Sequence, residues 1–270
     1  MQKTLFLFVP ATRLDRVPKA RDSGADKIII DLEDAVADDQ KQDVRTALRA
    51  FDATAQHSYW LRINASHTAE YHLDIACIKQ LNNLAGVLLP KCQNALQVES
   101  LHHQINTPVI AMIETAVGIA SIANIATSKG LWAMSFGRLD LMHELGVRLG
   151  SQASELIFDK IRADLLIHSV ANGLNPPIET IFAEFDNESG LRACVRHWSD
   201  FGFGGQLLIH PKQITTVRQV LKMDEDELAF AQAIYQKHQE TGDTVFAIDG
   251  KMVDLPLIHW ATRLLKPAKN

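Results

Sequence analysis

The 270-residue sequence has few cysteines, no excess of positive charge and no paired-cysteine motif. Its three cysteines (Cys77, Cys92 and Cys194) are far apart and form no C-x-x-C pair, which favours reduced thiols in a cytoplasmic protein. The 27 Lys and Arg residues are outnumbered by 32 Asp and Glu residues, for a net charge of −5 at pH 7. Nucleic-acid-binding proteins carry clustered Lys and Arg, so we expect no nucleic-acid partner.

Long apolar segments are also missing. A short apolar run, L-F-L-F-V-P-A, follows Lys3, but Pro10 closes it and charged residues begin at Arg13. The run is at the lower limit for a signal peptide, so a first core strand is the better interpretation. No stretch approaches the roughly 20 apolar residues that span a bilayer. We therefore expect a soluble protein with no membrane partner.

Short runs rich in Val, Ile and Leu recur at fairly even spacing. Most are continuously apolar, which is typical of parallel strands covered on both faces. Eight such runs occupy residues 4–11, 27–33, 59–64, 86–91, 108–114, 131–137, 177–183 and 206–211. Helical patterns lie between them, for example at 43–51 and 154–171. Asn94 is expected to cap a helix that runs through Leu101, and Ser154 to cap the long helix.

Strands that alternate with helices, at about thirty residues per unit, predict an α/β protein with a (β/α)8 TIM-like barrel. A doubly wound sheet is the structural alternative. It would usually carry a glycine-rich phosphate turn after an early strand, and no G-x-G-x-x-G occurs in this sequence.

The chain continues beyond the eighth run. We expect residues 1–222 to form the barrel and residues 223–270 a short C-terminal extension. The extension has a helical pattern, a hairpin turn at Asp249-Gly250 and a last helix through Leu265. It is too small for a second domain, so we expect it to pack on the barrel or on a neighbouring subunit.

Polar residues follow the apolar runs, at the strand ends where barrel enzymes hold their active sites. They are Asp31, Glu33, Asp34, Arg62, Asn64, Lys91, Glu114, Asp140 and His210. The acidic residues Glu114 and Asp140 follow adjacent strands and could supply two oxygen ligands to Mg²⁺. Arg62 opposite them could stabilise an oxyanion. This combination suggests enolate chemistry on an anionic carbonyl compound.

Several stretches occur in a telling order: L-F-V-P-A-T-R-L-D-R, I-I-I-D-L-E-D-A-V, L-R-I-N, L-L-P-K, A-M-I-E-T-A-V-G-I and G-Q-L-L-I-H-P-K. The D-L-E-D-A-V stretch with the following Lys41 and Arg45 is specific. From about residue 5 to residue 220, the sequence resembles the citrate lyase β-subunit-like proteins of the HpcH/HpaI aldolase superfamily. That superfamily includes malyl-CoA and citramalyl-CoA lyases.

The resemblance implies a barrel enzyme, usually trimeric or built from trimers, so a homotrimer or hexamer is expected. It implies Mg²⁺-dependent retro-aldol cleavage of a 3-hydroxy acyl-CoA thioester to a keto acid and acetyl-CoA. By position, Arg62 matches the catalytic arginine, and Glu114 and Asp140 match the metal ligands. Glu33 and Asp34 match the acidic pair that lines the site and helps to hold metal-bound waters and Arg62.

Four basic residues are candidates for binding the substrate or CoA: Arg13, Arg16, Lys91 and Arg138. Arg138 and Leu139 depart from the family pattern, which has a small residue and an acid before the metal Asp. The extra cation could bind a substrate carboxylate or the CoA phosphates.

Two further departures from the family pattern concern the eighth apolar run and the C-terminal extension. Gln206 stands where the family has Lys, which would remove one positive contact. Larger relatives carry a C-terminal lid that supplies an Asp to the adjacent subunit's site. Asp249 and Asp254 are the candidates for that role here, and the general base is unassigned.

Other interpretations stay open at this point. Asp34 could instead cap the segment after the second strand and pair with Lys41 and Arg45. His210 is expected to be a buried hydrogen-bonding residue rather than a base. The alternatives to a stand-alone lyase are a thioester hydrolase, the β subunit of a multi-subunit citrate lyase, and a non-catalytic acyl-CoA-binding protein. Citramalyl-CoA, malyl-CoA and citryl-CoA are all candidate substrates.

Overall fold

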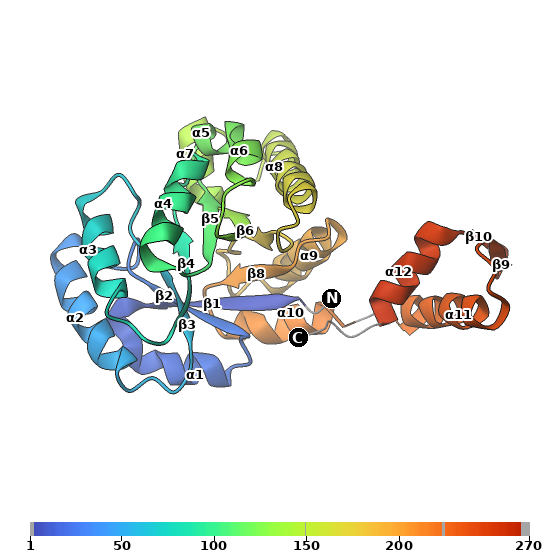
Figure 1. Cartoon of the computed structure of the whole chain (residues 1–270), viewed down its shortest axis with the longest axis horizontal. Coiled ribbons are helices and arrows are strands. Elements are labelled where there is room, and N and C mark those ends of the chain that lie inside the picture. The colour runs from blue at the N-terminus through green and yellow to red at the C-terminus, as the bar shows by residue number, and fades with distance from the viewer. Residues whose placement is uncertain (1–2, 149, 223–224, 266–270) are drawn as a thin grey trace. The chain divides into compact units, whose positions relative to one another are not determined.

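A computed structural model describes residues 3–148, 150–222 and 225–265. The chain divides into two compact units (Figure 1). One is Thr4–Val220, and the other contains Lys3 and the described residues from Leu221 onward. Whether the second unit packs on the barrel or on a neighbouring subunit stays a prediction.

The first unit is a closed barrel of eight strands, each parallel to its neighbours. The predicted (β/α)8 TIM-like fold is therefore confirmed. The strands are β1 (Thr4–Pro10), β2 (Lys27–Asp31), β3 (Tyr59–Arg62), β4 (Leu84–Leu89), β5 (Val109–Ile113), β6 (Leu131–Phe136), β7 (Ile178–Glu179) and β8 (Gly205–Leu208). They follow one another around the barrel in chain order.

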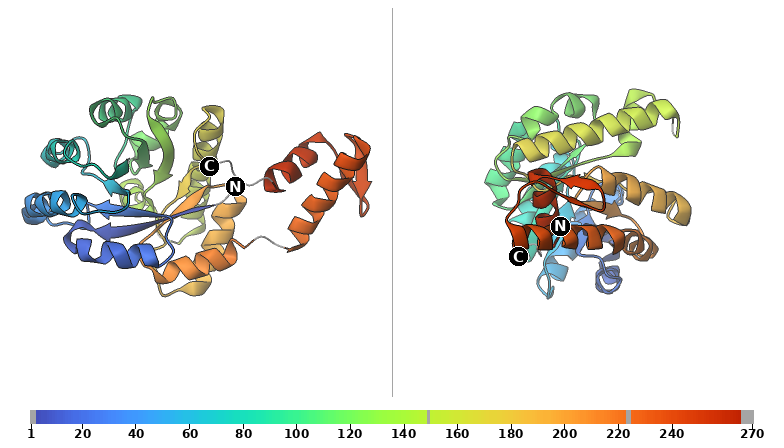
Figure 2. Two further views of the ribbon diagram at one scale, coloured as in Figure 1. Left: turned by 60° about the horizontal axis from the view of Figure 1, so that its bottom comes forward. Right: turned by 90° about the vertical axis from the view of Figure 1, so that its right-hand side faces the viewer.

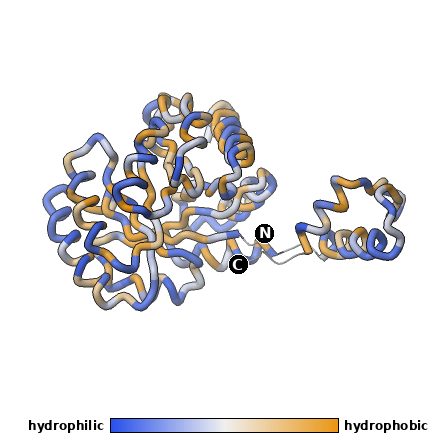
Figure 3. Tube along the Cα trace, in the orientation of Figure 1, coloured by the Kyte–Doolittle hydropathy of each residue, from blue (hydrophilic) through white to orange (hydrophobic). Residues whose placement is uncertain are grey.

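Helices surround the strands on the outside of the barrel (Figure 2). They are η1 (Ala11–Arg16), α1 (Val17–Asp22), η2 (Asp38–Gln40), α2 (Lys41–Asp52), α3 (Ala69–Ile78), α4 (Ala95–Ile105), α5 (Ala116–Ala120), α6 (Ile122–Ile125), α7 (Arg138–Leu145), α8 (Gln152–Ala171), α9 (Glu188–Asp200) and α10 (Lys212–Val220). Hydrophobic and hydrophilic residues alternate along these helices (Figure 3), because one face packs on the sheet and the other meets solvent.

Alternate residues of the strands point into the barrel and fill its interior. This interior cluster consists of Phe6, Ile29, Trp60, Leu88, Ile110, Met112, Ala133, Ile178 and Leu207. Successive side chains of a strand point to opposite faces, so a residue two positions beyond an interior residue faces the mouth of the barrel. Asp31, Arg62 and Glu114 stand in that position after Ile29, Trp60 and Met112. The alternation along each strand therefore places these three charged side chains at the mouth of the barrel.

The barrel closes where β8 meets β1. Thr4 pairs with Gly205, and a Cβ atom on Gly205 would lie 2.0 Å from the Thr4 carbonyl oxygen. Only glycine allows the two backbones to approach this closely.

The helix-start predictions had mixed outcomes. Asn94 caps α4 as predicted, in a capping box in which its side chain accepts from the Gln97 N–H, although the helix runs on to Ile105. The prediction for Ser154 was wrong, because Ser151 is the cap of α8 and its hydroxyl accepts the Ser154 N–H. Both residues are serines, and the capping position falls to the one whose backbone is extended.

The seventh strand is shorter than predicted. It spans only Ile178–Glu179, and it joins β6 through a single register pair, Ser135 and Ile178. Residues 180–183 leave the sheet. The prediction of burial holds for residues 177–180, whereas Ile181 and Phe182 are partly exposed and Ala183 is exposed.

The second unit has a small core of its own. It contains α11 (Glu225–Thr241), the antiparallel pair β9 (Phe246–Ile248) and β10 (Lys251–Val253), and α12 (Leu255–Leu265). Asp249 and Gly250 have positive φ angles of 49° and 75°, which confirms the predicted hairpin turn. Buried Ile234, Val253 and Ile258 link the helices to the hairpin.

Among the described residues, no helix combines the length and apolar character needed to cross a membrane.

Candidate active site

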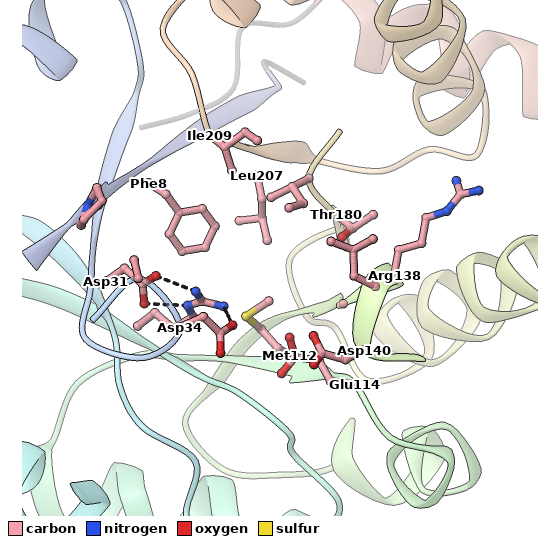
Figure 4. Close-up of a pocket in the computed structure, with 16 residues that line it drawn as sticks. Phe8, Asp31, Asp34, Met112, Glu114, Arg138, Asp140, Thr180, Leu207 and Ile209 are labelled. Carbon is pink, nitrogen blue, oxygen red and sulfur yellow. Dashed lines mark hydrogen bonds and ion pairs between the residues drawn. The ribbon is translucent and has the colours of Figure 1, made fainter. Parts of the chain in front are cut away.

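Arg62 is held by a carboxylate from the neighbouring strand. Asp31 and Arg62 are register partners at the ends of β2 and β3. The Arg62 Nε and Nη2 atoms donate to the two Asp31 oxygens at 2.8 and 2.5 Å, and Nη1 donates to Asp34 at 3.0 Å (Figure 4). The guanidinium also lies over the Phe8 ring, 5.0 Å from its centroid. A two-pronged pair of this kind fixes the plane of the guanidinium as well as its position.

Arg62 is charged in this environment. Burial on its own lowers the pKa of Arg62, but the hydrogen bonds and charge of Asp31, together with the charges of Glu33 and Asp34, raise it overall. A permanent, oriented cation therefore faces the barrel mouth.

Glu33 lies between two cations. Its Oε1 accepts from Lys91 Nζ at 2.7 Å, and its Oε2 is 3.2 Å from Arg62 Nη1. The Oε2 contact is an ion pair without hydrogen-bond geometry. Burial raises the pKa of Glu33 by more than Arg62 and Lys91 lower it. Glu33 thus joins the end of β2 to the loop after β4.

The backbone around Glu33 is anchored by a buried lysine. Lys41 Nζ donates to the carbonyls of Leu32 and Glu33 and to the side chain of Asn64. Arg45 pairs instead with Asp74.

The alternative in which these two cations pair with Asp34 was therefore wrong. Asp34 also caps no helix, because it is engaged by Arg62 and η2 begins four residues later without a side-chain cap. Lys41 holds the loop that carries the acidic residues, and Asn64 fixes the loop after β3 through the same contacts.

Glu114 follows β5 and is only 2% exposed. Its Oε2 accepts the backbone N–H of Lys91 at 2.8 Å. Lys91 has a φ of 49°, in the left-handed region, and this conformation directs its N–H at Glu114 while its side chain reaches Glu33. Burial, followed by the charges of Glu33 and Asp140, raises the pKa of Glu114 to about 7. A cation beside Glu114 would relieve this repulsion.

Space for Glu114 is made by Gly137. A Cβ atom on Gly137 would lie 2.4 Å from Glu114 Oε1, so any larger residue would displace the carboxylate. Gly137 is also the residue before α7, whose first turn carries Asp140. Glu114 and Asp140 lie close together at the edge of the pocket (Figure 4).

These two carboxylates fit Mg²⁺. No group of three or more His, Cys, Asp or Glu ligands occurs in the part of the chain that the structure describes. Zinc usually requires such a set, whereas Mg²⁺ is bound through one or two carboxylates and keeps several waters. The charges of Glu33 and Asp140, which add to the effect of burial in raising the pKa of Glu114, are the second observation in favour of a cation at this place.

A pocket of about 400 Å³ opens over the barrel mouth. Arg62, Glu114, Asp140, Asp31 and Asp34 line it, so five of the charged residues at the strand ends meet in one cavity. Glu33 and Lys91 stand behind this lining, in contact with it.

Of the remaining basic candidates, Arg138 lines the pocket, whereas Arg13 and Arg16 do not. Arg138 lines the pocket with part of its side chain, but its guanidinium points away, pairs with Glu155 and lies 4.7 Å from the centroid of the Phe158 ring. Arg13 is half-exposed and pairs with Asp15, and Arg16 is exposed on the same helix η1. Their roles in binding substrate or CoA stay predictions.

Two residues near the chain's eighth strand are not part of the pocket lining. Gln206 is fully buried on the outer side of β8, where it accepts from Trp198 Nε1 at 3.2 Å. The departure from the family's Lys therefore concerns packing against α9. His210 is partly exposed rather than buried, stacks on Phe185, and accepts the Lys212 N–H through Nδ1.

Sequence reasoning placed Asp31 at the barrel mouth but gave it no chemical role, although its two oxygens accept the shortest hydrogen bonds from Arg62. The signal was present in the alternation of β2, where Asp31 stands two residues after the interior residue Ile29. Thr180 and Ile181, which line the opposite wall, carried no comparable signal because they lie beyond the short β7.

The chain belongs to the HpcH/HpaI aldolase/citrate lyase family, whose pattern matches residues 4–211. The family resemblance stated from the motifs is thereby confirmed.

Its relatives are similar over nearly their whole length. The (3S)-malyl-CoA thioesterase of Cereibacter sphaeroides is 32% identical over 255 residues, covering 92% of this chain and 88% of that protein. The citrate lyase subunit beta-like protein of Mycobacterium tuberculosis is 34% identical over 272 residues, covering 97% and 94%. The crystal structure of CitE from M. tuberculosis in complex with magnesium, acetoacetate and coenzyme A has a TM-score of 0.87 and 31% identity, covering 98% and 97%.

Proposed function

We propose that this protein is a Mg²⁺-dependent carbon–carbon lyase that cleaves a 3-hydroxy acyl-CoA thioester to a keto acid and acetyl-CoA. The observation that carries the proposal is that one pocket holds both the oriented guanidinium of Arg62 and the closely spaced carboxylates of Glu114 and Asp140. The magnesium and coenzyme A in the similar CitE structure support it.

The residues divide the work as follows. Glu114 and Asp140 would hold Mg²⁺, which as a Lewis acid supplies stabilisation of the hydroxyl and carboxylate oxygens of the substrate. Arg62 donates to the oxygen on which negative charge develops, and Asp31 keeps its fork in place so that no reorganisation is needed during the reaction. Glu33 and Asp34 balance the charge of Arg62 on its other side.

The bond that breaks joins the hydroxyl-bearing carbon to the carbon next to the thioester. The hydroxyl proton leaves to a base and the C–O bond becomes the carbonyl of the keto acid. The electron pair of the broken bond forms the enolate of acetyl-CoA, which then takes a proton. Arg13 and Arg16, which follow β1 on η1, are proposed contacts for the CoA phosphates.

A thioester hydrolase is the second candidate, because a malyl-CoA thioesterase is among the similar proteins. The two reactions share the metal and the oxyanion but give different products. Hydrolysis releases the CoA thiol, whereas cleavage of the carbon–carbon bond releases a keto acid and leaves the thioester intact.

The test is a product assay on the purified full chain with Mg²⁺, using citramalyl-, malyl- and citryl-CoA separately. The keto acid and the free thiol are measured in parallel, with EDTA as one control and Glu114→Ala as another. Keto acid without thiol supports the lyase, and loss of product in both controls supports the metal site. Thiol without keto acid would establish the hydrolase instead. No product from any of the three thioesters would overturn both proposals.

A further inference from the structure

The proposed metal ligand Asp140 lies on a short helix that has few anchors of its own. Of the eight described residues of α7, only Leu141 is buried, and Gly137 offers no side chain to cap the helix. The far end of α7 is tied to α5, where Glu144 Oε1 accepts the Ala116 N–H at 2.9 Å. A helix with so little buried surface depends on a few specific contacts for its position. The first turn, which carries Asp140, therefore requires an anchor other than these.

Arg138 is the first residue of α7 and provides that anchor. Its Nη2 atom donates to Glu155 Oε1 on α8, and its guanidinium lies over the Phe158 ring, 4.7 Å from the ring centroid. Figure 4 shows the guanidinium turned away from Asp140. Glu155 and Phe158 are three positions apart, so they lie on one face of α8. An ion pair and a ring contact on the same guanidinium fix its plane as well as its position.

The two residues that hold Arg138 belong to a rigid layer behind the pocket. Phe158 is fully buried and stacks on Phe136, the last residue of β6, with ring centroids 6.1 Å apart and an interplanar angle of 26°. Arg162 lies 5.4 Å from the centroid of the Phe136 ring. Its Nε and Nη2 atoms donate to both oxygens of the buried Glu179 on β7, at 2.9 and 2.7 Å. The contacts of Arg138 therefore tie α7 to the packed side chains between the sheet and α8.

Arg138 can affect a bound Mg²⁺ in two ways, and these have opposite signs. Its positive charge, two residues before Asp140, repels a cation and weakens binding. Its contacts with α8 hold the first turn of α7, keep the Asp140 carboxylate beside Glu114 and strengthen binding. The pairing with Glu155 reduces the first effect, because the carboxylate offsets the charge of the guanidinium.

We propose that Arg138 is a positioning residue for the metal site: through Glu155 and Phe158 it holds the first turn of α7, so that Asp140 and Glu114 can share one Mg²⁺. This inference rests on the metal assignment in the proposed function. It requires no contact between Arg138 and the substrate, because the guanidinium already has its partners on α8. A small side chain at this position could reach neither partner.

The deciding variant is Arg138→Met, which keeps a long apolar stem and removes the cation. The purified full chain is titrated with MgCl₂ in a calorimeter at pH 8, above the pKa of about 7 of Glu114. Loss of a positioning contact should weaken Mg²⁺ binding by about tenfold. Loss of a repelling charge alone would make Mg²⁺ bind more tightly. Unchanged or tighter binding would overturn the inference.

Arg138→Lys separates geometry from charge. The ammonium keeps the charge and can pair with Glu155, but it lacks the planar group that lies on Phe158. Mg²⁺ binding should weaken by about threefold, between the unchanged protein and Arg138→Met. If the Met variant does not fold, the Lys variant provides the test, since its charge is unchanged. Weaker binding then supports the inference, and unchanged binding overturns it.

The matched control is Arg192→Met on α9. Arg192 also pairs with a glutamate, Glu188, but the pair is on the surface and away from the pocket lining. Its Mg²⁺ affinity should stay within about twofold of the unchanged protein, because a surface ion pair contributes little. An equal loss in Arg192→Met and Arg138→Met would overturn the inference, since a general effect of losing a cation would then explain both.

The outcomes separate this inference from the proposed function. Absence of Mg²⁺ binding in the unchanged protein would overturn the metal assignment and this inference with it. Equal Mg²⁺ affinities in the unchanged protein and Arg138→Met would overturn this inference and leave the proposed lyase in place. A lower Tm in Arg138→Met without any change of Mg²⁺ affinity would show a purely structural role and would overturn it as well.

Discussion

At the scale of single residues, the central feature is Arg62, whose guanidinium is held in one orientation. Asp31, the register partner of Arg62 on β2, holds the guanidinium by hydrogen bonds. The guanidinium also packs over the Phe8 ring. Oriented donors of this kind stabilise a developing oxyanion without a reorganisation cost. In the proposed mechanism, the chemistry therefore depends on the fork geometry of the guanidinium and not only on its charge.

Arg62→Lys should lower kcat by about 100-fold or more, because an ammonium cannot reproduce the paired donors of the guanidinium. Steady-state kinetics of keto-acid formation provides the measurement. Arg196→Lys, the same change at an exposed position on α9, should behave as the unchanged protein does. A lysine variant with a near-normal rate would remove Arg62 from the mechanism.

Asp31→Asn should also lower kcat, by about tenfold to 100-fold, although Asp31 does not touch the reacting atoms in the proposed mechanism. The amide keeps one acceptor but opposes the other guanidinium nitrogen with a donor, so the orientation of Arg62 is lost. Asp31→Glu keeps the charge and should recover part of the rate. Recovery of nothing in the Glu variant, together with a full loss of folded protein, would show a purely structural role.

Glu114 gives the metal-free protein a pH-dependent stability. Its folded-state pKa of about 7 lies above the ordinary value of 4.5, so this group favours the folded state at low pH. That advantage is lost as the pH rises from 4.5 through about 7, and it amounts to about 3 kcal/mol when complete. Mg²⁺ binds the ionised carboxylate, so it should raise Tm more at pH 8 than at pH 5.5. Thermal melts with and without Mg²⁺ provide the check, and an equal effect at both pH values, or the same trend in Glu114→Gln, would contradict it.

At the scale of elements, the sequence predicted more of the fold than of the site. The continuous apolar runs located all eight strands, since both faces of each strand are covered. The ends of β2, β3 and β5 also located Asp31, Arg62 and Glu114, because parallel strands finish at the same edge. Residues past the end of β7 were beyond this reasoning, since no hydrogen-bond pattern fixes where Thr180 and Ile181 lie.

Side-chain partners were harder to predict than positions. Arg138 stood in the right loop, yet Glu155 on α8 holds its guanidinium outside the pocket. Lys41 was associated with Asp34 because the two are close in sequence, whereas it bonds the carbonyls of Leu32 and Glu33. Such choices depend on elements distant in the chain, which a local pattern does not contain.

Gly137→Ala tests the junction of β6 and α7. The added Cβ would meet Glu114 Oε1 at 2.4 Å, so the Glu114 carboxylate must shift from its position beside Asp140. Mg²⁺ affinity is expected to fall by about tenfold or more, as measured by calorimetry. Gly173→Ala is the control: it lies after α8 at a positive φ of 66° with no neighbour within 4 Å of the added Cβ. It should lose about 1 kcal/mol of stability and keep its Mg²⁺ affinity. Equal Mg²⁺ affinities in the two variants would contradict the role of Gly137.

At the scale of the whole molecule, the proposed chemistry belongs to one of two units. Arg62, Glu114 and Asp140 all lie within Thr4–Val220, and the second unit has its own buried cluster around Ile234 and Val253. The barrel should therefore hold its metal without help from the C-terminal extension. Turnover could still require the C-terminal extension, because no residue of the barrel is assigned as the general base.

A chain ending at Lys222 should keep the circular-dichroism spectrum of a folded α/β protein and bind Mg²⁺ within about twofold of the full chain. If Asp249 or Asp254 of a neighbouring subunit supplies the base, as the family resemblance suggests, kcat should fall by about 100-fold or more while pyruvate still binds. Light scattering on both chains would show whether the expected trimer persists. Loss of Mg²⁺ binding in the shortened chain would contradict the independence of the barrel.

Because β7 joins β6 through a single register pair, the sheet holds one side of the pocket more firmly than the side formed by the residues after β7. Arg62 ends β3 and Glu114 follows β5, and each of these strands pairs with both neighbouring strands over several residues, so the sheet fixes their positions. Residues 180–183 are released from the sheet and can exchange side chains without breaking a ladder. Directed evolution confined to these four positions should therefore diversify the acyl groups accepted while the chemical step is preserved.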